Sequence, residues 1–353
     1  MGESFGLMTE EPRQGGLGPQ VEGEWSSTGP YEHPAAGWGA ALTVGKVLYQ
    51  QRQPVAGTRA MFTMNHPKSG FDCPGCAWPD PDHRSPAEFC ENGAKAVAEE
   101  ATRAVAGPAF FAEHSVEELR GWDDHSLGKQ GRLTHPMLLD AGATHYRPVS
   151  WDEALDVVAS ELLALDSPDE AVFYTSGRTS NEAAFAYQLL VRGFGTNNLP
   201  DCSNMCHESS GSALTESIGI GKGSVSLNDV AAADVIVVAG QNPGTNHPRM
   251  LSTLEKAARR GARIIAVNPL REVGLEKFAN PQEPLSIARG GTTLATDHLQ
   301  IRLGGDQALF QAWGRVLLEA EEAAPGTVFD REFLERSTHG LEPYLEHLRA
   351  LDW

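Results

Sequence analysis

Short apolar runs that alternate with helical stretches are the feature of this sequence that most constrains its fold. Three runs have the composition of buried strands: residues 171–175 (AVFYT), 234–240 (DVIVVAG) and 263–267 (RIIAV). Residues 181–194 and a stretch whose apolar face includes Met250 and Leu254 have the spacing of helices between these runs. Strands of this length that alternate with helices favour right-handed βαβ units. The sequence therefore predicts an α/β fold built on a doubly wound parallel sheet.

Helix boundaries are marked by local signals. Ser150 followed by Glu153 forms a capping box at the start of a helix with a 3.6-residue apolar period. Cys90 precedes an alanine-rich stretch that favours a helix. Before the helix that contains Met250, Asn246 is the expected cap and Pro248 suits the first turn. Two further helices are expected near residues 307–320 and 330–350.

Three regions follow from these signals. Residues 1–60 are rich in Gly, Pro and polar side chains and predict an extended N-terminal arm. Residues 61–132 contain three of the five cysteines and form the expected cysteine-bearing lobe. Residues 133–353 form the α/β region.

The charge balance excludes several classes of partner. The chain has 353 residues, with 28 basic and 47 acidic side chains and a formal charge of −19. A nucleic-acid or anionic-membrane binder needs a basic face, so neither class fits. No apolar run reaches the roughly 18–20 residues of a membrane span, and no secretory signal is recognisable. We therefore expect a cytoplasmic protein that binds any anion through a local pocket of helix ends and a few basic groups.

The first three cysteines have the spacing of a metal site. Cys73, Cys76 and Cys90 form a C-x2-C-x13-C pattern, and soft thiolates on loops suit zinc or an iron–sulfur cluster. The spacing leaves the choice between them open, and Asp82 or His83 is a candidate fourth ligand. A thioredoxin-like cysteine pair or a vacant site is the alternative.

Further candidate residues lie in the α/β region. Cys206 and His207 pair a thiol with a neighbouring proton acceptor, although a buried structural cysteine also fits this pattern. Loops at residues 240–248, 268–271 and 303–306 follow predicted strands or precede helices, where free backbone N–H groups bind phosphates. Together the three loops predict a nucleotide-like cofactor at one sheet edge.

In combination these segments resemble the molybdopterin oxidoreductases, and within them the formate-dehydrogenase-like branch. The resemblance runs from about Phe71 to the C-terminus, with the pieces in the family's order. Those pieces are the cysteine-rich segment, LTHP (133–136), PVSWDEAL (148–155), SGRTSNEAAFAYQLLVRGFGTNN (176–198), DCSNMCHESSG (201–211), VIVVAGQNPGTNHPRM (235–250), VNPLREV (267–273) and IRLGGDQAL (301–309).

The resemblance implies a role for each matched residue. Cys206 falls where the family places the ligand of molybdenum or tungsten, and His207 falls where it places the proton acceptor. Cys73, Cys76 and Cys90 match the segment that holds a [4Fe–4S] cluster in an N-terminal iron–sulfur lobe. The residues implied to bind the two guanine-dinucleotide pterins (bis-molybdopterin guanine dinucleotide) are Arg178, Asn242, Gly244, Thr245, His247, Asn268, Arg271, Gly304 and Asp306.

The implied function is the two-electron oxidation of a small substrate, with formate as a candidate, and electrons leave through the cluster to an acceptor protein. The sequence departs from the family pattern, because the lobe has three cysteines instead of four and Lys95 is displaced from its usual place after the last of them. The sequence also ends at Trp353, where a member of the family is expected to continue into a second half. Two alternatives therefore remain: a non-catalytic or split-subunit fragment that needs a separate chain for the C-terminal half, and an NAD-dependent α/β dehydrogenase with structural zinc.

Overall fold

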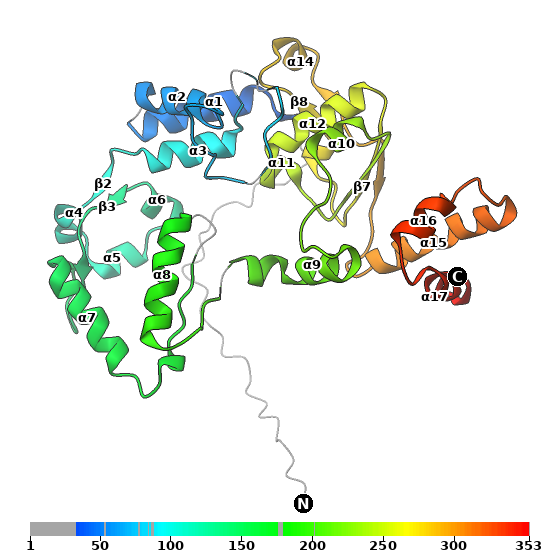
Figure 1. Cartoon of the computed structure of the whole chain (residues 1–353). Helices are drawn as coiled ribbons and strands as arrows, with labels where there is room; N and C mark the ends of the chain where they lie inside the picture. Colours follow the sequence, from blue (N-terminus) through cyan, green and yellow to red (C-terminus); the bar gives the residue numbers. More distant parts are fainter. Residues whose placement is uncertain are drawn as a thin grey trace, which may run out of the picture. The chain divides into compact units, whose positions relative to one another are not determined.

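The computed structural model describes residues 33–352, apart from residues 53, 77, 84, 86–87, 176–178 and 201 and the side chains of 202–205. The chain divides into two units, Met1–His33 and Pro34–Trp353. The helices and strands labelled in Figure 1 belong to the second unit. Among the described residues, no helix combines the length and apolar character needed to cross a lipid bilayer.

Helices begin earlier in the chain than the sequence suggested. Helix α1 (Gly37–Gln50), α2 (Pro54–Thr63) and α3 (Glu91–Glu100) pack around Leu48, Met61, Ala94 and Ala98. The expectation of an extended arm up to residue 60 is therefore wrong for the described part of that range. Its glycines and prolines suggested a loop, but Gly37 and Pro54 stand at helix starts, and Ala94 and Ala98 let the helices approach closely.

The middle of the unit is built from short elements. They are β2 (Val105–Ala106), α4 (Pro108–Glu113), α5 (Val116–Arg120), α6 (Asp124–Gly128), β3 (Arg132–Leu133), β4 (Met137–Leu138), β5 (Arg147–Pro148), α7 (Trp151–Leu163), the 3-10 turn η1 (Pro168–Glu170) and α8 (Asn181–Phe194). Strand β2 pairs parallel with β3, and β4 pairs antiparallel with β5.

The sequence predicted two of these helices correctly, α7 from its capping serine and α8 from its apolar spacing. Ser150 Oγ accepts a hydrogen bond from the backbone N–H of Glu153 at 3.1 Å, so α7 begins where it was expected. In a complete capping box the carboxylate of Glu153 would also accept a hydrogen bond from the backbone N–H of Ser150. In the structure this carboxylate forms an ion pair with Arg147 instead, 2.8 Å from Nη2. Helix α8 has the predicted limits.

The first predicted strand is absent from the described residues. Residues 171–174 are not part of a β-ladder and Thr175 makes a single β-bridge, although the backbone N–H of Phe173 donates to the carbonyl of Asn198 at 2.9 Å. An apolar run becomes a strand only when a neighbouring strand supplies its hydrogen-bond partners. This correction leaves the parallel sheet to the later strands.

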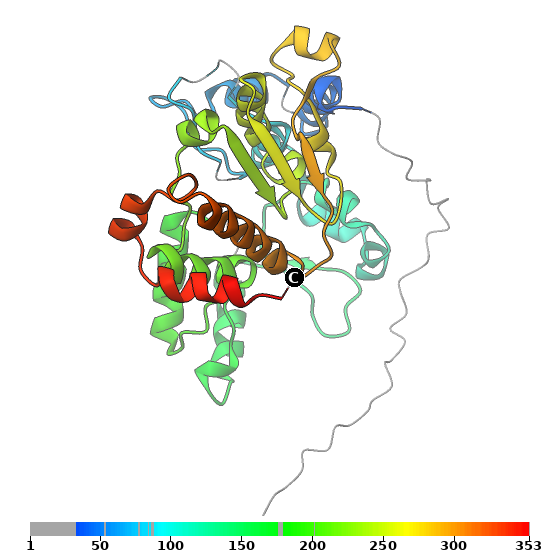
Figure 2. The same ribbon diagram turned by 90° about the vertical axis from the view of Figure 1, so that its right-hand side faces the viewer.

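A three-stranded parallel sheet is the centre of the α/β region (Figure 2). Its order is β10 (Asp297–Leu299), β7 (Arg263–Val267) and β6 (Val235–Ala239), and helices α10 (Leu227–Ala232), α11 (Pro243–Asn246) and α12 (Pro248–Arg259) are its sequence neighbours. The α/β fold, the parallel sheet and the strands at β6 and β7 are confirmed.

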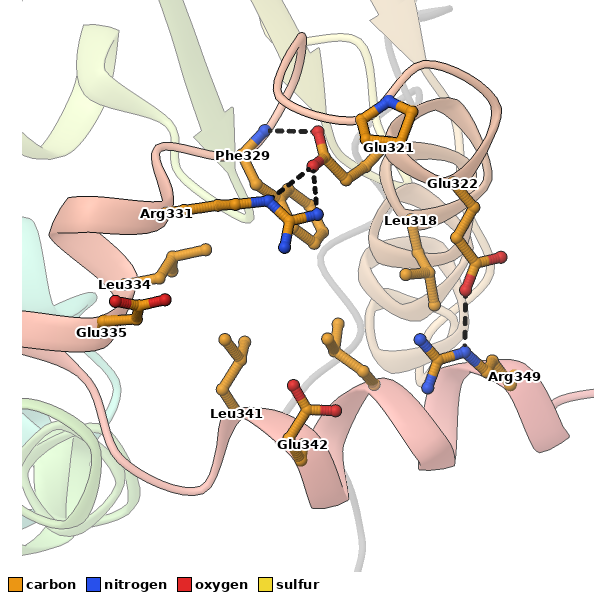
Figure 3. A pocket seen from close by; sticks show the side chains of 12 residues that line it. Leu318, Glu321, Glu322, Phe329, Arg331, Leu334, Glu335, Leu341, Glu342 and Arg349 are labelled. Atoms are coloured by element: carbon orange, nitrogen blue, oxygen red, sulfur yellow. Dashed lines mark hydrogen bonds and ion pairs between the residues drawn. The ribbon is translucent and has the colours of Figure 1, made fainter.

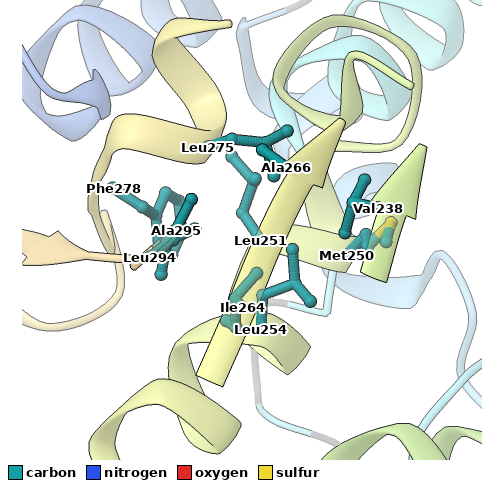
Figure 4. Packing of buried hydrophobic residues seen from close by; sticks show 10 residues of the cluster. All are labelled: Val238, Met250, Leu251, Leu254, Ile264, Ala266, Leu275, Phe278, Leu294 and Ala295. Carbon is teal, nitrogen blue, oxygen red and sulfur yellow. The ribbon is translucent and has the colours of Figure 1, made fainter. Parts of the chain in front are cut away.

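Helix α12 covers one face of this sheet. The core on this face includes residues of α12, of β6 and β7, and of the segment between β7 and β10: Val238, Met250, Leu251, Leu254, Ile264, Ala266, Leu275, Phe278, Leu294 and Ala295 (Figure 4). The side chains of β6 that point to the opposite face are less covered, since Val235 and Val237 are 58% and 41% exposed. The doubly wound arrangement, with helices on both faces, therefore stays a prediction.

A second small sheet joins the beginning of the unit to the α/β region. Strand β8 (Lys277–Ala279) pairs parallel with β1 (Ala35–Ala36) and antiparallel with β9 (Thr292–Thr293). The short helices α13 (Val273–Glu276) and α14 (Pro284–Ala288) flank β8.

Three C-terminal helices form a separate small core. Helices α15 (Asp306–Ala323) and α17 (Leu341–Ala350) meet at Leu318, Leu345 and Leu348, and α16 (Arg331–Ser337) lines the cavity beside them. The stretch predicted near 330–350 is thus two helices. A cavity of about 400 Å³ lies among them, and Figure 3 shows the carboxylate of Glu321 bound to the backbone of Phe329 and to Arg331 at its margin.

Candidate functional site

The carboxyl edge of the parallel sheet collects the loops that the sequence singled out. Gly240 follows β6 and its N–H donates to the carbonyl of Val267 at 2.8 Å, while the N–H of Asn268 donates to Leu299 at 3.1 Å. Each bond ties the end of one strand to the end of the next. Asn242, Asn268 and the turn after β10 therefore start from one edge, which is where open α/β sheets bind ligands.

Asn242 organises the loop after β6. Its Oδ1 accepts from the backbone N–H of Thr245 at 3.2 Å, so Asn242 caps α11, and its Nδ2 donates to the carboxylate of Glu272 at 2.6 Å. The expected cap, Asn246, is instead the last residue of α11, and the α12 cap His247 makes no capping hydrogen bond through its side chain. The ring of His247 is 3.1 Å from Nε2 of Gln241.

Two glycines bring this loop against the helix after β7. A Cβ atom on Gly274 would stand 2.8 Å from Cα of Gly244, a distance that real side chains do not adopt. The sequence assigned Gly244 to the cofactor, and the structure gives it a packing role with a partner that the sequence reasoning missed. The two loops can approach this closely only because both residues lack side chains.

Of the remaining predicted edge residues, Asn268 is half-buried, whereas Arg271, Gly304 and Asp306 are exposed. Asn268 Oδ1 accepts from the N–H of Leu270 at 2.9 Å, which fixes the turn after β7. Arg271 is exposed and forms an ion pair with Glu276 at 2.8 Å. Gly304 and Asp306 are exposed at the start of α15. Arg178 lies outside the described residues.

The cysteine loop is held by backbone hydrogen bonds around two of its sulfur atoms. Asn65 Oδ1 accepts from the N–H of Cys73 at 2.8 Å. Cys73 Sγ accepts from the N–H of Gly75 and Cys90 Sγ from that of Gly93, both at 3.4 Å. A Cβ atom on Gly93 would approach Cys73 Sγ to 2.8 Å, so this glycine lies between the two thiols. The sequence correctly placed Cys90 at the start of α3, as its N-cap.

The neighbouring cysteines affect the pKa of Cys90. Burial raises the pKa of Cys90, and the nearby Cys73 and Cys76 raise it further, while the N–H of Gly93 lowers it. In the described part of the chain, no three His, Cys, Asp or Glu side chains are close enough to hold one metal ion. In an iron–sulfur cluster each thiolate binds a different iron atom, so its sulfur atoms do not have to converge on one metal ion. Thiolates are ligands of zinc and of iron–sulfur clusters alike, so the three cysteines stay candidate ligands of either.

Direct contacts join the cysteine loop to the sheet edge. Asn92 Nδ2 donates to the backbone carbonyl of Thr245 at 2.6 Å. Arg249, in the first turn of α12, pairs with Asp80 at 2.6 Å and with Glu88 at 3.1 Å. These residues hold the two predicted cofactor regions together. Sequence reasoning missed both Asn92 and Arg249, because each acts on residues more than 150 positions away.

Cys206 and His207 lie on helix α9 (Cys202–Ile218). Both side chains are exposed, and neither makes a hydrogen bond or ion pair with another residue that the structure describes. Adjacent helix positions point about 100° apart, so the two groups share an end of the helix without facing each other. The structure therefore leaves their catalytic assignment as a prediction. Lys95, which the sequence found displaced, pairs with Glu91 at 2.6 Å.

The structure defines an α/β protein with a cysteine-bearing loop tied to the carboxyl edge of a parallel sheet. The family model for molybdopterin oxidoreductases matches residues 132–324, which is more than half of the chain. This chain belongs to the molybdopterin oxidoreductase family, whose members use a molybdenum or tungsten pterin cofactor. Family membership displaces the alternative of an NAD-dependent dehydrogenase.

Individual relatives agree with this assignment. The chain is 59% identical over 316 residues to an uncharacterized oxidoreductase of Mycobacterium tuberculosis, a match that covers 89% of this chain and 40% of that protein. It is 46% identical to the protein YdeP of Escherichia coli (92% and 43% covered) and 32% identical to formate dehydrogenase H of the same species (64% and 29% covered). The chain thus spans about two fifths of the length of the Mycobacterium tuberculosis oxidoreductase and of YdeP.

A solved structure, acetylene hydratase from Pelobacter acetylenicus, is similar with a TM-score of 0.45 and 22% identity over 61% of this chain and 27% of that one.

Proposed function

We propose that this chain binds a molybdenum or tungsten pterin guanine dinucleotide at the carboxyl edge of its sheet and a [4Fe–4S] cluster at Cys73, Cys76 and Cys90. The observation that carries the proposal is the hydrogen bond from Asn92 to Thr245, which ties the cysteine loop to the edge loop. Electron transfer between two cofactors depends on a fixed separation, and this bond fixes the two binding regions to each other.

The edge residues divide into groups that bind and groups that support. Backbone N–H groups in the loop at residues 241–244, together with the exposed guanidinium of Arg271, would bind the phosphates of the dinucleotide. Asn242 would hold this loop in place without binding the phosphates itself, because the oxygen and nitrogen of its amide are already bonded to Thr245 and Glu272. Such local donors are what a chain with a net charge of −19 needs to bind an anion.

Cys206 and His207 would carry the chemistry at the metal. The thiolate of Cys206 is a soft ligand of the kind that completes a pterin-bound metal site, and the imidazole of His207 would take the substrate proton. When bound, the metal–pterin group supplies the two-electron acceptor. Formate, the candidate substrate, would lose one proton and two electrons to give carbon dioxide, and the electrons would pass through the cluster to an acceptor protein.

The second candidate function is that of a cofactor-binding part of an enzyme, which catalyses the reaction only together with a further polypeptide. The exposed Val235 and Val237 favour it, because parallel sheets are normally covered on both faces. Helix α9 favours it too, since all its described residues except Gly211 and Leu214 are exposed. Binding of the pterin without turnover by this chain alone, and turnover after addition of the remaining part of a relative, would select this candidate.

A thiol exchange in α9 tests the metal assignment. The variant Cys206→Ser should retain less molybdenum or tungsten and lose one sulfur ligand in X-ray absorption spectra of the metal. The matched control is Cys202→Ser, which removes a thiol from the same helix and should leave the metal–sulfur shell unchanged. An identical shell in the wild-type chain and in Cys206→Ser would refute the assignment.

A further inference from the structure

Three cysteines leave one position of a four-iron cluster without a thiolate. Cys73, Cys76 and Cys90 are the cysteines of the lobe, and the other two in the chain, Cys202 and Cys206, belong to α9. Clusters of this type normally have four cysteine ligands. If the cluster proposed above forms, its fourth iron needs a ligand from some other side chain.

A cavity beside the cysteine loop limits the choice of that ligand. It has a volume of about 890 Å³, and its wall includes Cys73, Cys76, Asp72, Asp80 and Arg249. Thiolates and carboxylates are both metal ligands, so the two aspartates are the candidates that share this cavity with Cys73 and Cys76, while Cys90 does not line it. The candidates named from the sequence, Asp82 and His83, do not line it, and Oδ2 of Asp82 is engaged by Nδ2 of Asn228 at 2.8 Å.

Asp80 is held in place, whereas Asp72 is not. Asp80 Oδ1 is 2.6 Å from Nη2 of Arg249, whose side chain is only 9% exposed and is anchored in turn by Glu88 and by the backbone carbonyl of Trp78. The second oxygen of Asp80, Oδ2, makes no hydrogen bond to the residues that the structure describes. Both aspartates are exposed, but Asp72 has no ion pair or hydrogen bond to described residues. A ligand must be both oriented and available, and Asp80 meets both conditions.

We propose that Asp80 is the fourth ligand of the cluster, with Oδ2 on the iron that lacks a thiolate and Oδ1 held by Arg249. The proposal rests on the proposed function, because it presupposes the cluster. A carboxylate is a harder ligand than a thiolate and binds iron of a sulfide cluster less tightly. The iron at Asp80 is therefore the one that oxidation removes first.

Iron and sulfide analysis with electron paramagnetic resonance tests this ligand in the full chain, purified without oxygen. The wild-type chain should hold about four irons and, after mild ferricyanide oxidation, convert to a three-iron cluster with its own spectrum. Asp80→Ala should hold about three irons before any oxidant is added. Asp80→Cys should keep the fourth iron and resist the oxidant. Asp72→Ala is the matched control and should behave as the wild type does.

The outcomes separate the ligand proposal from the function on which it rests. Four irons and an unchanged spectrum in Asp80→Ala would overturn Asp80 as the ligand and leave the cluster intact. If Asp80→Ala fails to fold, Asp80→Cys decides, because oxidant sensitivity equal to that of the wild type overturns the ligand proposal. A wild-type chain that holds zinc and no iron would instead contradict the proposed function.

Discussion

Asn92 donates a hydrogen bond from Nδ2 to the backbone carbonyl of Thr245 at 2.6 Å. Asn92 is two residues after Cys90, in the first turn of α3, and Thr245 lies in α11, directly after β6. The bond therefore links the start of the helix that Cys90 caps to the loop proposed to bind the pterin. A change at Asn92 should be felt at both places.

Removal of this bond should weaken the attachment of the cysteine loop. A single hydrogen bond contributes about 0.5–1.5 kcal/mol, so Asn92→Ala should lower the free energy of unfolding by that amount. Chemical denaturation of the purified chain measures the change. The control is Asn246→Ala, an exposed asparagine of the neighbouring loop, which should change stability by less than about 0.5 kcal/mol. Equal effects of the two variants would show that the bond to Thr245 does not stabilise the attachment.

The contact between Gly244 and Gly274 should not tolerate a side chain. A Cβ atom on Gly274 would lie 2.8 Å from Cα of Gly244, so Gly274→Ala must push the loop after β6 away from α13. We expect a lower Tm and a weaker retention of the pterin. Gly45→Ala in helix α1 is the control, because a Cβ atom there meets nothing within 4 Å and alanine favours a helix over glycine by about 0.5–1 kcal/mol. A Gly274→Ala variant as stable as the wild type would contradict the packing role.

The core beneath the sheet should be sensitive to loss of volume. Leu254 is fully buried between α12 and the sheet, and Leu254→Ala should cost about 2–5 kcal/mol of unfolding free energy. Leu163→Ala, at an exposed leucine at the end of α7, should cost less than about 0.5 kcal/mol. Urea denaturation followed by circular dichroism measures both. A small loss in Leu254→Ala would mean that α12 does not pack on the sheet as described.

Acid should release the interaction that closes the C-terminal helices. Hydrogen bonds from the backbone N–H groups of Gly326 and Phe329, with Arg331 beside them, lower the pKa of Glu321 to about 2 from an ordinary 4.5. Because the pKa is lower in the folded chain, Glu321 stabilises the fold above pH 4.5, and this contribution is lost as the pH falls from about 4.5 to about 2.

Thermal unfolding between pH 7 and pH 2.5 measures this contribution. Glu321→Gln should lower the Tm at pH 7 and show a smaller further decrease in acid than the wild type does. Glu335→Gln, an exposed glutamate on α16 near the same cavity, should follow the wild-type profile. A parallel decrease of the Tm in wild type and Glu321→Gln would show that Glu321 does not supply the acid sensitivity.

Much of the fold could be predicted because its signals are local. The capping serine at position 150 and the apolar runs at β6 and β7 depend on neighbouring residues, and the structure has these elements where they were expected. Residues 37–50 failed as a prediction because glycines were read as loop formers, whereas packing against α3 keeps this segment helical. Propensity is a weak guide where tertiary contacts decide.

The arrangement of the site was less accessible from the sequence. The cysteines and edge loops were identified by their spacing and their place after strands. The family match covers residues 132–324, so it includes the edge loops but not the three cysteines. Arg249 carried no local signal of its role, because Asp80 lies 169 positions earlier in the chain. Gly244 was found, but its packing partner Gly274 could be recognised only from the approach of two backbones.

Metal and pterin analysis of the chain is the most direct measurement of the central claim. The chain is expressed in a host that makes the molybdenum pterin cofactor, purified without oxygen, and assayed for Mo, W, Fe and Zn and for the fluorescence of oxidised pterin. Our account predicts molybdenum or tungsten together with pterin and iron in the wild-type chain. It also predicts loss of iron when Cys73 and Cys76 are both changed to Ser. Zinc at the cysteines, with neither pterin nor iron in the purified chain, would contradict it.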